Sequence, residues 1–184
     1  MKITESQLEL LRSLKCERLS SKPENFSLID DFYNTRNNSL VDTLQGDAYD
    51  DDENNRIAYY IVKTVDDKIL FFFSLKCGLL YDEFIEGDRL KEIKFFYDTI
   101  FWYFIVPKIL EMLKIVGCEY VFLFAADLTP YEELIRYYSD QLKFEKADEH
   151  CVAIPMYDFT CQFMSQKTCE LEGKREQFFE EFNN

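Results

Sequence analysis

The sequence predicts an α/β protein built on a mixed sheet with helices on both faces. Three observations support this fold class. Two extended runs, 56–65 and 68–78, are separated by a two-residue turn, which is typical of a β-hairpin. The apolar residues of 104–116 have helical spacing and precede a strand-like run, and a second helix followed by strands begins near residue 131. A chain of 184 residues suits one domain.

The N-terminal part predicts two helices. "MKITESQLELLRSLKC" places Leu8, Leu11 and Leu14 on one side of an amphipathic helix. Pro23 and its polar neighbours interrupt this pattern, and the apolar residues then resume helical spacing over a second predicted helix, 26–38. The chain opens without the apolar stretch of a secretory signal, which favours a cytoplasmic protein.

The acidic run "QGDAYDDDENN", residues 45–55, has almost nothing apolar to bury, so we predict a loop. It lacks the alternating ligand spacing and the downstream glutamate of a calcium loop. The predicted hairpin follows it, with Asp66 and Asp67 in the turn. Its second strand has a near-continuous apolar run from Ile69 to Phe73, which predicts a strand covered on both faces.

The run "TIFWYFIVPKILEMLKIVG", residues 99–117, raises the question of a membrane span. Lys108, Glu111 and Lys114 recur through its second half, which is costly in hydrocarbon. We therefore predict an amphipathic core helix and no membrane insertion. Because Pro107 would clash inside a long uninterrupted helix, we expect the main helix to begin just before it.

The remaining elements complete the predicted sheet. "CEYVFLFAAD" predicts a buried strand ending at Asp127, and a helix follows it to about Gln141. A short helix is expected over 86–97, and a strand over "HCVAIPMYDF" with "TCQFMSQ" as its hairpin partner. We divide the single domain predicted for residues 1–184 into an N-terminal helix and linker (1–25), a core (26–164) and a polar C-terminal tail or helix (165–184).

The charge restricts the classes of partner. The chain has 21 Lys and Arg against 35 Asp and Glu, a net charge of −14. Nucleic acids and anionic membranes both need a cationic surface, so the composition argues against either partner and favours a cationic one. An excess of carboxylates that serves only solubility is the alternative reading.

The six cysteines are widely spaced and include no C-x-x-C pair, which argues against a metal site. We expect reduced thiols, several of them buried as small apolar groups. The chain also has no glycine between Gly87 and Gly117.

Residues 57 to about 164 resemble the GNAT superfamily of acetyl-CoA-dependent acyltransferases. "KILFFFSLKCG" is similar to the strand that splays from its neighbour and exposes its backbone to the pantetheine arm. "FWYFIVPKILEMLKIVGCEYVFLFAAD" looks like the helix whose start receives the pyrophosphate and the strand after it. "LIRYYSDQLKFEKA" looks like the last helix, with its tyrosine and Phe144. The resemblance implies a GNAT-like, mostly antiparallel central sheet and acetyl-CoA as cofactor.

Two features depart from the family pattern. The glycine-rich motif at the start of the long helix is absent, and bulky aromatic residues stand where the backbone would approach a pyrophosphate. Lys143 stands in the glycine position of the Gly-Phe signature. Either the protein has lost its phosphate cradle, or a segment between Tyr97 and Thr99 is missing from this sequence.

The resemblance assigns roles to several residues. It implies direct attack of an amine on the thioester, with Tyr138 or else Tyr137 as the acid and Asp127 as a base or amine-orienting group. For the tyrosines the alternative is plain packing, and for Asp127 it is turn chemistry. The positions expected to contact the cofactor are Phe73, Ser74, Leu75, Cys77 and Phe101.

Other candidates are weaker. Asp82 and Glu83 could attract a cationic amine, or they are simply solvated. His150, the only histidine, could be a base, but its place beside a predicted edge strand favours a surface role. Cys77 has no neighbouring histidine or basic cluster to activate it as a nucleophile.

Two functions remain open. The first is an acetyl-CoA-dependent N-acetyltransferase acting on an amine-bearing small molecule or protein. The second is a catalytically inactive, acidic GNAT-like module that binds or inhibits a basic protein partner. The acceptor and the oligomeric state do not follow from the sequence.

Overall fold

The computed structural model describes most of the chain. The described residues are 4–34, 38–76, 85–86, 97–125, 131–146 and 161–183. They belong to two compact units, Met1–Phe96 and Tyr97–Asn184, each with its own antiparallel sheet. The single domain over 1–184 stays a prediction.

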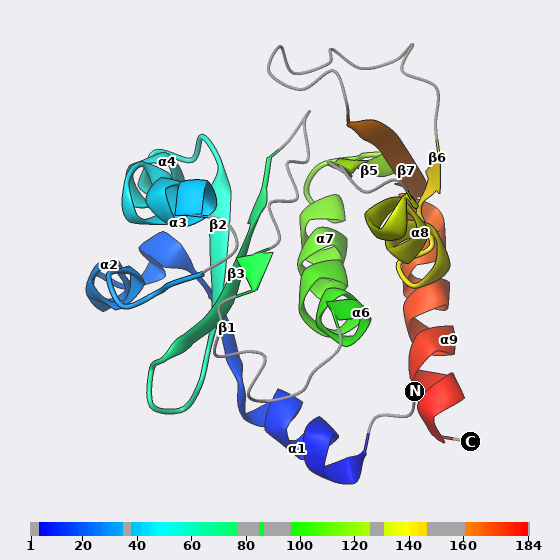
Figure 1. Cartoon of the computed structure of the whole chain (residues 1–184), viewed down its shortest axis with the longest axis horizontal. Helices are drawn as coiled ribbons and strands as arrows, with labels where there is room; N and C mark the ends of the chain where they lie inside the picture. The colour runs from blue at the N-terminus through cyan, green and yellow to red at the C-terminus, as the bar shows by residue number, and fades with distance from the viewer. Residues whose placement is uncertain are drawn as a thin grey trace. The chain divides into compact units, whose positions relative to one another are not determined.

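The described strands of the first unit form a four-stranded sheet in the order β1-β2-β3-β4 (Figure 1). They are β1 (Lys15–Arg18), β2 (Ala58–Lys63), β3 (Ile69–Leu75) and β4 (Ile85–Glu86). The predicted hairpin is confirmed, because β2 and β3 pair along their length. Asp67 in the turn has a φ of 58°, a left-handed conformation that aspartate adopts more readily than most residues.

Every residue of β3 is buried, which confirms the prediction of a strand covered on both faces. On one face the ring of Phe73 stacks on Tyr60 of β2, with ring centroids 5.1 Å apart. On the other face Phe72 belongs to the core cluster of this unit.

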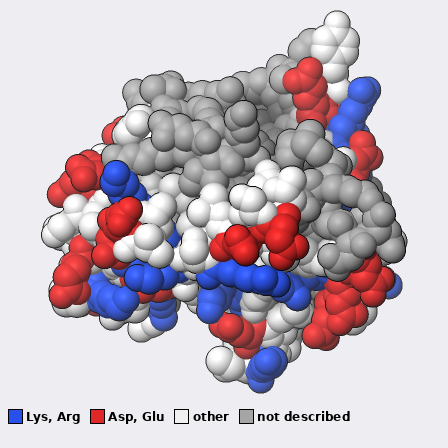
Figure 2. Space-filling model, turned by 90° about the horizontal axis from the view of Figure 1, so that it is seen from below, with Lys and Arg blue, Asp and Glu red and all other residues white. Residues whose placement is uncertain are grey.

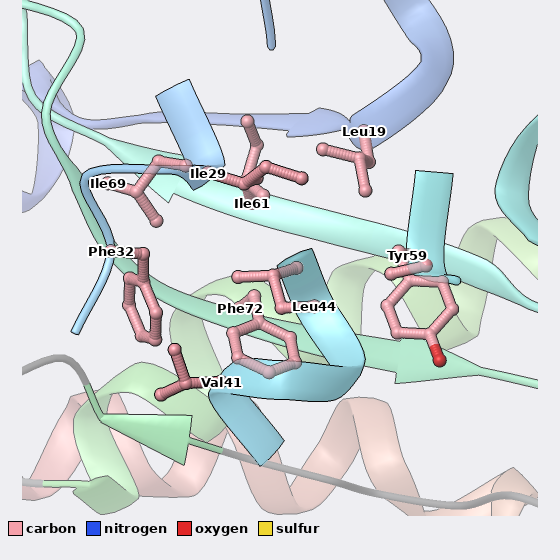
Figure 3. Close-up of a cluster of buried hydrophobic side chains, with 10 residues drawn as sticks. Leu19, Ile29, Phe32, Val41, Leu44, Tyr59, Ile61, Ile69 and Phe72 are labelled. Carbon is pink, nitrogen blue, oxygen red and sulfur yellow. The ribbon is translucent and has the colours of Figure 1, made fainter. Parts of the chain in front are cut away.

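Helices α2 (Glu24–Ile29), α3 (Asn38–Gln45) and α4 (Ala48–Glu53) lie on one side of β2 and β3 (Figure 1). Together with the sheet they enclose a cluster of buried residues, shown in Figure 3: Leu19, Ile29, Phe32, Val41, Leu44, Ala48, Tyr59, Ile61, Ile69 and Phe72. The single helix predicted over 26–38 is wrong. α2 ends at Ile29, and a turn closed by the Phe32 N–H and the Ile29 carbonyl brings Phe32 against Phe72.

The loop predicted over 45–55 is also wrong, because α4 forms inside it. Asp52 is fully buried, and its carboxylate accepts hydrogen bonds from Nε of Arg18 at 2.7 Å and from the N–H groups of Ser20 and Tyr59 at 2.7 and 2.8 Å. A carboxylate tolerates burial when it is paired and hydrogen-bonded. One residue of the acidic run therefore attaches the helix to the sheet.

The N-terminal prediction is confirmed for the helix and corrected for the linker. Helix α1 (Glu5–Ser13) has a capping box formed by Thr4 and Gln7, and Leu11 is buried. Part of the linker predicted within 1–25 is instead β1, which pairs antiparallel with β2. The four residues of β1 read KCER and carry no strand-like alternation of apolar residues.

The described strands of the second unit form a sheet in the order β5-β7-β6. They are β5 (Tyr120–Ala125), β6 (Glu145–Lys146) and β7 (Gln162–Lys167). The strands predicted from "CEYVFLFAAD" and "TCQFMSQ" are confirmed as β5 and β7, which pair antiparallel. The strand predicted over "HCVAIPMYDF" and most of the helix predicted over 86–97 lie outside the described residues.

A continuous helix runs from Tyr97 to Leu113 in three segments. These are α6 (Tyr97–Ile100), a π-helical stretch (Phe101–Ile105), called the π-turn from here on, and α7 (Val106–Leu113). The expected helix start just before Pro107 needs correction, since α7 begins there but the chain before it is already helical. The wider π-turn gives the ring of Pro107 room that an α-helical turn would deny it.

Helices α8 (Glu133–Asp140) and α9 (Leu171–Asn183) complete the second unit, and α9 packs against α7 (Figure 1). Of the two alternatives for the C-terminal segment, the structure shows a helix. The α/β fold class with antiparallel sheets is confirmed. Among the described helices none is long and apolar enough to cross a bilayer. None of the described cysteines is fully buried, so the expected burial is wrong for these four: Cys16, Cys118, Cys161 and Cys169.

Candidate active site

The C-terminal half of α8 carries the two tyrosines predicted as acids. Tyr137 and Tyr138 are both half-buried, their ring centroids lie 5.8 Å apart, and the Tyr137 hydroxyl is buried. The carbonyl of Tyr138 accepts a hydrogen bond of 3.0 Å from the N–H of Phe144. This bond closes the turn after α8 and fixes the backbone of Tyr138. The catalytic role of either tyrosine stays a prediction.

Lys143 occupies the position where the family resemblance expects glycine. Its φ is 63°, the left-handed conformation that glycine adopts most easily. Its Nζ donates a hydrogen bond of 2.6 Å to the carbonyl of Asp140 at the end of α8. The backbone therefore forms a turn suited to glycine although the side chain differs from the family pattern.

Phe144 leads from this turn into an aromatic core. It is 2% exposed, and its ring centroid lies 5.8 Å from that of Phe101 in the π-turn. Phe101 is equally buried and meets Trp102 edge-on at 5.0 Å. The side chain of Phe101, a predicted cofactor position, is thus part of the packing. A cofactor role there would rest on its backbone and stays a prediction.

Trp102 is a residue that the sequence analysis missed. It is 1% exposed, and its indole Nε1–H donates to the carbonyl of Gln141, just after α8, at 3.2 Å. Its own carbonyl accepts a hydrogen bond of 2.8 Å from Nε of Arg175 in α9. Trp102 therefore joins the end of the tyrosine-bearing helix to the C-terminal helix. The signal in the sequence that could have identified Trp102 is its position five residues before Pro107. A proline has no N–H to donate to the carbonyl five residues earlier in a π-helix.

The first turn of the continuous helix holds a carboxylate, Asp98. Burial raises the pKa of Asp98, and its Oδ1 has no hydrogen-bond partner in the part of the chain that the structure describes. The N-terminus of a helix favours an anion. Asp98 places a carboxyl group of the chain itself at this helix end, so a cofactor phosphate bound there would have to lie beside it.

The predicted pantetheine contacts lie at the end of β3. β4 pairs with β3 opposite Phe71 and Phe72 in the described structure, and Phe73, Ser74 and Leu75 follow beyond those pairs. All three side chains are buried, so any contact with a cofactor would come from their backbone. Their assignment as cofactor contacts stays a prediction.

Several predicted residues fall outside the described structure. Asp127, Cys77 and His150 are among them, as are Asp82 and Glu83. Their predicted roles stay predictions. Within the described residues no group of three or more His, Cys, Asp or Glu side chains is arranged to hold a metal ion.

Comparison with known proteins shows likeness in structure. No family model matches the chain, and no curated protein matches its sequence. Among solved structures, AtaTR bound with AcCoA is 16% identical with a TM-score of 0.63, over 89% of this chain and 98% of that one. AtaT complexed with acetyl-methionyl-tRNAfMet is 13% identical with a TM-score of 0.62, over 88% and 98%. The spermidine/spermine N-acetyltransferase SpeG from Vibrio cholerae, in complex with manganese ions, is 12% identical with a TM-score of 0.57, over 90% and 98%.

The chain has the GNAT fold. These matches span nearly the whole of each solved chain, so the likeness includes both units rather than one shared motif. At such identities the likeness establishes the GNAT fold and leaves the activity to be argued from the site. In the second unit, the GNAT resemblance noted for α8 and Phe144 coincides with an observed left-handed turn and a buried aromatic contact.

Proposed function

We propose that the chain is an acetyl-CoA-dependent N-acetyltransferase that acts on an amine. The observation that carries this proposal is the end of α8, where the left-handed Lys143 turn and the buried Phe144 fix the backbone of Tyr138. The GNAT fold and a neighbour solved with AcCoA support the choice of cofactor.

The chain's residues fit the pantetheine arm of acetyl-CoA better than its pyrophosphate. Phe73, Ser74 and Leu75 supply an extended backbone of the kind that suits the amide-bearing pantetheine arm, whereas Asp98 and the buried Phe101 do not form a phosphate cradle. Acetyl-CoA, when bound, supplies the acetyl thioester. In this proposal the Tyr138 hydroxyl donates a proton to the departing sulfur, since a phenol is a competent acid.

We expect an amine acceptor rather than a nucleic acid. The net charge of −14 opposes nucleic-acid binding and attracts an ammonium group. SpeG is described as a spermidine/spermine N-acetyltransferase, which supports a small polyamine. AtaT is described with a charged tRNA, so an RNA-linked amine is the competing acceptor.

A second candidate function is a GNAT-like module without catalysis. Asp98 in the first helical turn and the absence of glycine between Gly87 and Gly117 favour it, because both oppose pyrophosphate binding. Such a module would bind a basic protein partner. On the face drawn in Figure 2, however, Lys and Arg side chains lie beside Asp and Glu, so that face is not a purely acidic surface.

Titration with acetyl-CoA tests the cofactor. Ligand at one hundred times its dissociation constant stabilises the folded state by about 2.7 kcal/mol, which a thermal-shift assay detects. An unchanged melting temperature at millimolar acetyl-CoA would rule out the enzyme and favour the module.

Turnover with Tyr138→Phe tests the acid. If Tyr138 is the proton donor, we expect kcat to fall at least about a hundredfold with little change in KM. Tyr137→Phe is the matched control because it removes the neighbouring hydroxyl from the same helix. Full turnover by Tyr138→Phe would exclude this residue as the acid.

Acetylation of two acceptors tests the substrate class. Spermidine and methionyl-tRNA are offered in parallel at equal ionic strength, and product is detected by mass. We expect the polyamine to be acetylated. Transfer to the tRNA alone would overturn the small-amine proposal and leave the acetyltransferase assignment standing.

A further inference from the structure

The π-turn leaves the backbone carbonyl of Trp102 without its helical donor. In a π-helix each N–H bonds to the carbonyl five residues earlier, and the Val106 N–H does bond to the Phe101 carbonyl. The next bond in that register would run from residue 107 to the Trp102 carbonyl. Pro107 has no N–H, so the helix cannot make this bond.

Arg175 supplies the missing donor from α9. Its Nε donates to the Trp102 carbonyl at 2.8 Å, in a partly buried position. The same guanidinium lies over the ring of Phe179, with Cζ 5.3 Å from the ring centroid, which fixes its orientation. An N–H donor for a buried carbonyl matters because an unsatisfied one is costly.

Aromatic contacts support the same arrangement. Phe178 of α9 stacks on Trp102 with centroids 6.0 Å apart, and Phe179 meets Tyr103 of the π-turn at 6.1 Å. The indole Nε1–H of Trp102 bonds to the carbonyl of Gln141 after α8. The π-turn is thus held between the end of α8 and one face of α9.

We propose that α9 is a clamp that maintains the π-turn, with Arg175 replacing the hydrogen bond that Pro107 removes. Arg175 is a positioning residue, since it acts through Trp102. Through the hydrogen bond from Trp102 to the Gln141 carbonyl, the clamp also fixes the position of the end of α8, the helix that carries Tyr138. Only this last consequence depends on the proposed acetyltransferase activity.

A double-mutant cycle in urea unfolding tests the replacement. Arg175→Met keeps the length of the side chain and removes the donor, so we expect a lower urea midpoint. Pro107→Ala restores an N–H to the helix, so in that background Arg175→Met should lower the midpoint by less than half as much. Equal losses in the two backgrounds would overturn the proposal.

Tryptophan fluorescence of the folded protein measures a local property that does not change with the free energy of unfolding. Trp102 is the only tryptophan, so tryptophan emission from the folded protein reports on the π-turn and the residues packed against it. We expect Arg175→Met to shift the emission to longer wavelength and to increase quenching by acrylamide. Lys174→Met is the matched control, because Lys174 pairs only with Glu170 of the preceding turn among the described ion pairs. Unchanged emission in Arg175→Met would contradict the clamp.

A third variant keeps the clamp testable if Arg175→Met does not fold, and wild-type measurements separate the clamp from the proposed activity. Arg175→Lys keeps a positive donor and should retain most of the urea midpoint and native emission, and loss equal to that of Arg175→Met would count against the clamp. These measurements need no cofactor. A wild-type protein that neither binds acetyl-CoA nor acetylates amines, yet shows the non-additive cycle, would refute the activity and leave the clamp in place.

Discussion

The two units attach their peripheral helices by different means. In the first unit, α4 is attached through the fully buried Asp52, which accepts hydrogen bonds from Arg18 and from two backbone N–H groups. In the second unit, α9 is attached through stacked rings and one donor to the Trp102 carbonyl. Charge organises the first attachment and aromatic packing the second.

This difference explains where sequence reasoning succeeds. Aromatic and aliphatic packing appears in the sequence as periodic apolar residues, which is why α7, β3 and β5 are recognisable. A buried carboxylate looks in the sequence like any solvated acid, so the role of Asp52 is hidden in a run of acidic residues. The predictions below test the contrast between these two kinds of attachment.

The largest expected effect is at Asp52. Asp52→Ala would leave Nε of Arg18 and the N–H groups of Ser20 and Tyr59 without their acceptor, at a cost of about 3–5 kcal/mol in unfolding free energy. Urea denaturation measures this loss. Glu53→Ala, at an exposed position of the same helix, is the control and should change stability by about 0.5 kcal/mol or less. Equal effects of the two substitutions would mean that charge does not hold α4.

An intermediate effect is expected at Glu17, which pairs with the buried Lys63 at 2.7 Å and with Lys22 at 2.6 Å. Burial acts to raise the pKa of Glu17, but hydrogen bonds from Lys22, Lys63 and Asn25 outweigh it and lower the pKa from 4.5 to about 2. Glu17→Gln should cost about 1–2 kcal/mol at pH 7.

The pH dependence of this effect has a definite sign. Because folding depresses the pKa of Glu17, its contribution is complete above about pH 4.5 and is lost as the pH falls toward 2. The stability difference between wild type and Glu17→Gln should therefore shrink over this interval. Asp67→Asn, which removes the more exposed partner of Lys63, is the control and should have the smaller effect at pH 7. A difference that stays constant from pH 7 to pH 2 would contradict the assignment.

The smallest expected effect is a gain in stability in the second unit. Lys143→Gly relieves a left-handed backbone that costs an L-residue about 1 kcal/mol, and it gives up one exposed hydrogen bond to Asp140. Thermal unfolding should show a net stabilisation of up to about 1 kcal/mol. Lys143→Ala keeps the strained backbone and loses the bond, so it should be slightly less stable than wild type. Equal behaviour of the two variants would show that the backbone there is not strained.

Only part of the fold of the first unit could be predicted from the sequence. The apolar run from Ile69 to Phe73 and the turn at Asp67 were enough to predict the hairpin, because strand burial and turn chemistry are local properties. β1 was missed because its KCER sequence has no strand-like pattern and its pairing with β2 involves residues more than 40 positions away. Partners so distant leave no local signal.

The candidate site was predictable only where the family resemblance applies. Tyr138 and Phe144 were found through that resemblance, and the structure adds the left-handed Lys143 between them. The bond from Arg175 to Trp102 joins residues 73 positions apart and involves a backbone carbonyl, which no side-chain pattern reveals. Only the presence of Pro107 indicates that a carbonyl needs an outside donor.

The burial of Lys63 has a consequence for chemical labelling. Its side chain is 4% exposed, and its ammonium is held by Glu17, Asp67 and Asn25. Amine-directed reagents, including any acetyl donor that reacts with surface lysines, should therefore modify Lys63 last. The rate at which mass spectrometry finds Lys63 modified would measure how often the end of the β2–β3 hairpin opens.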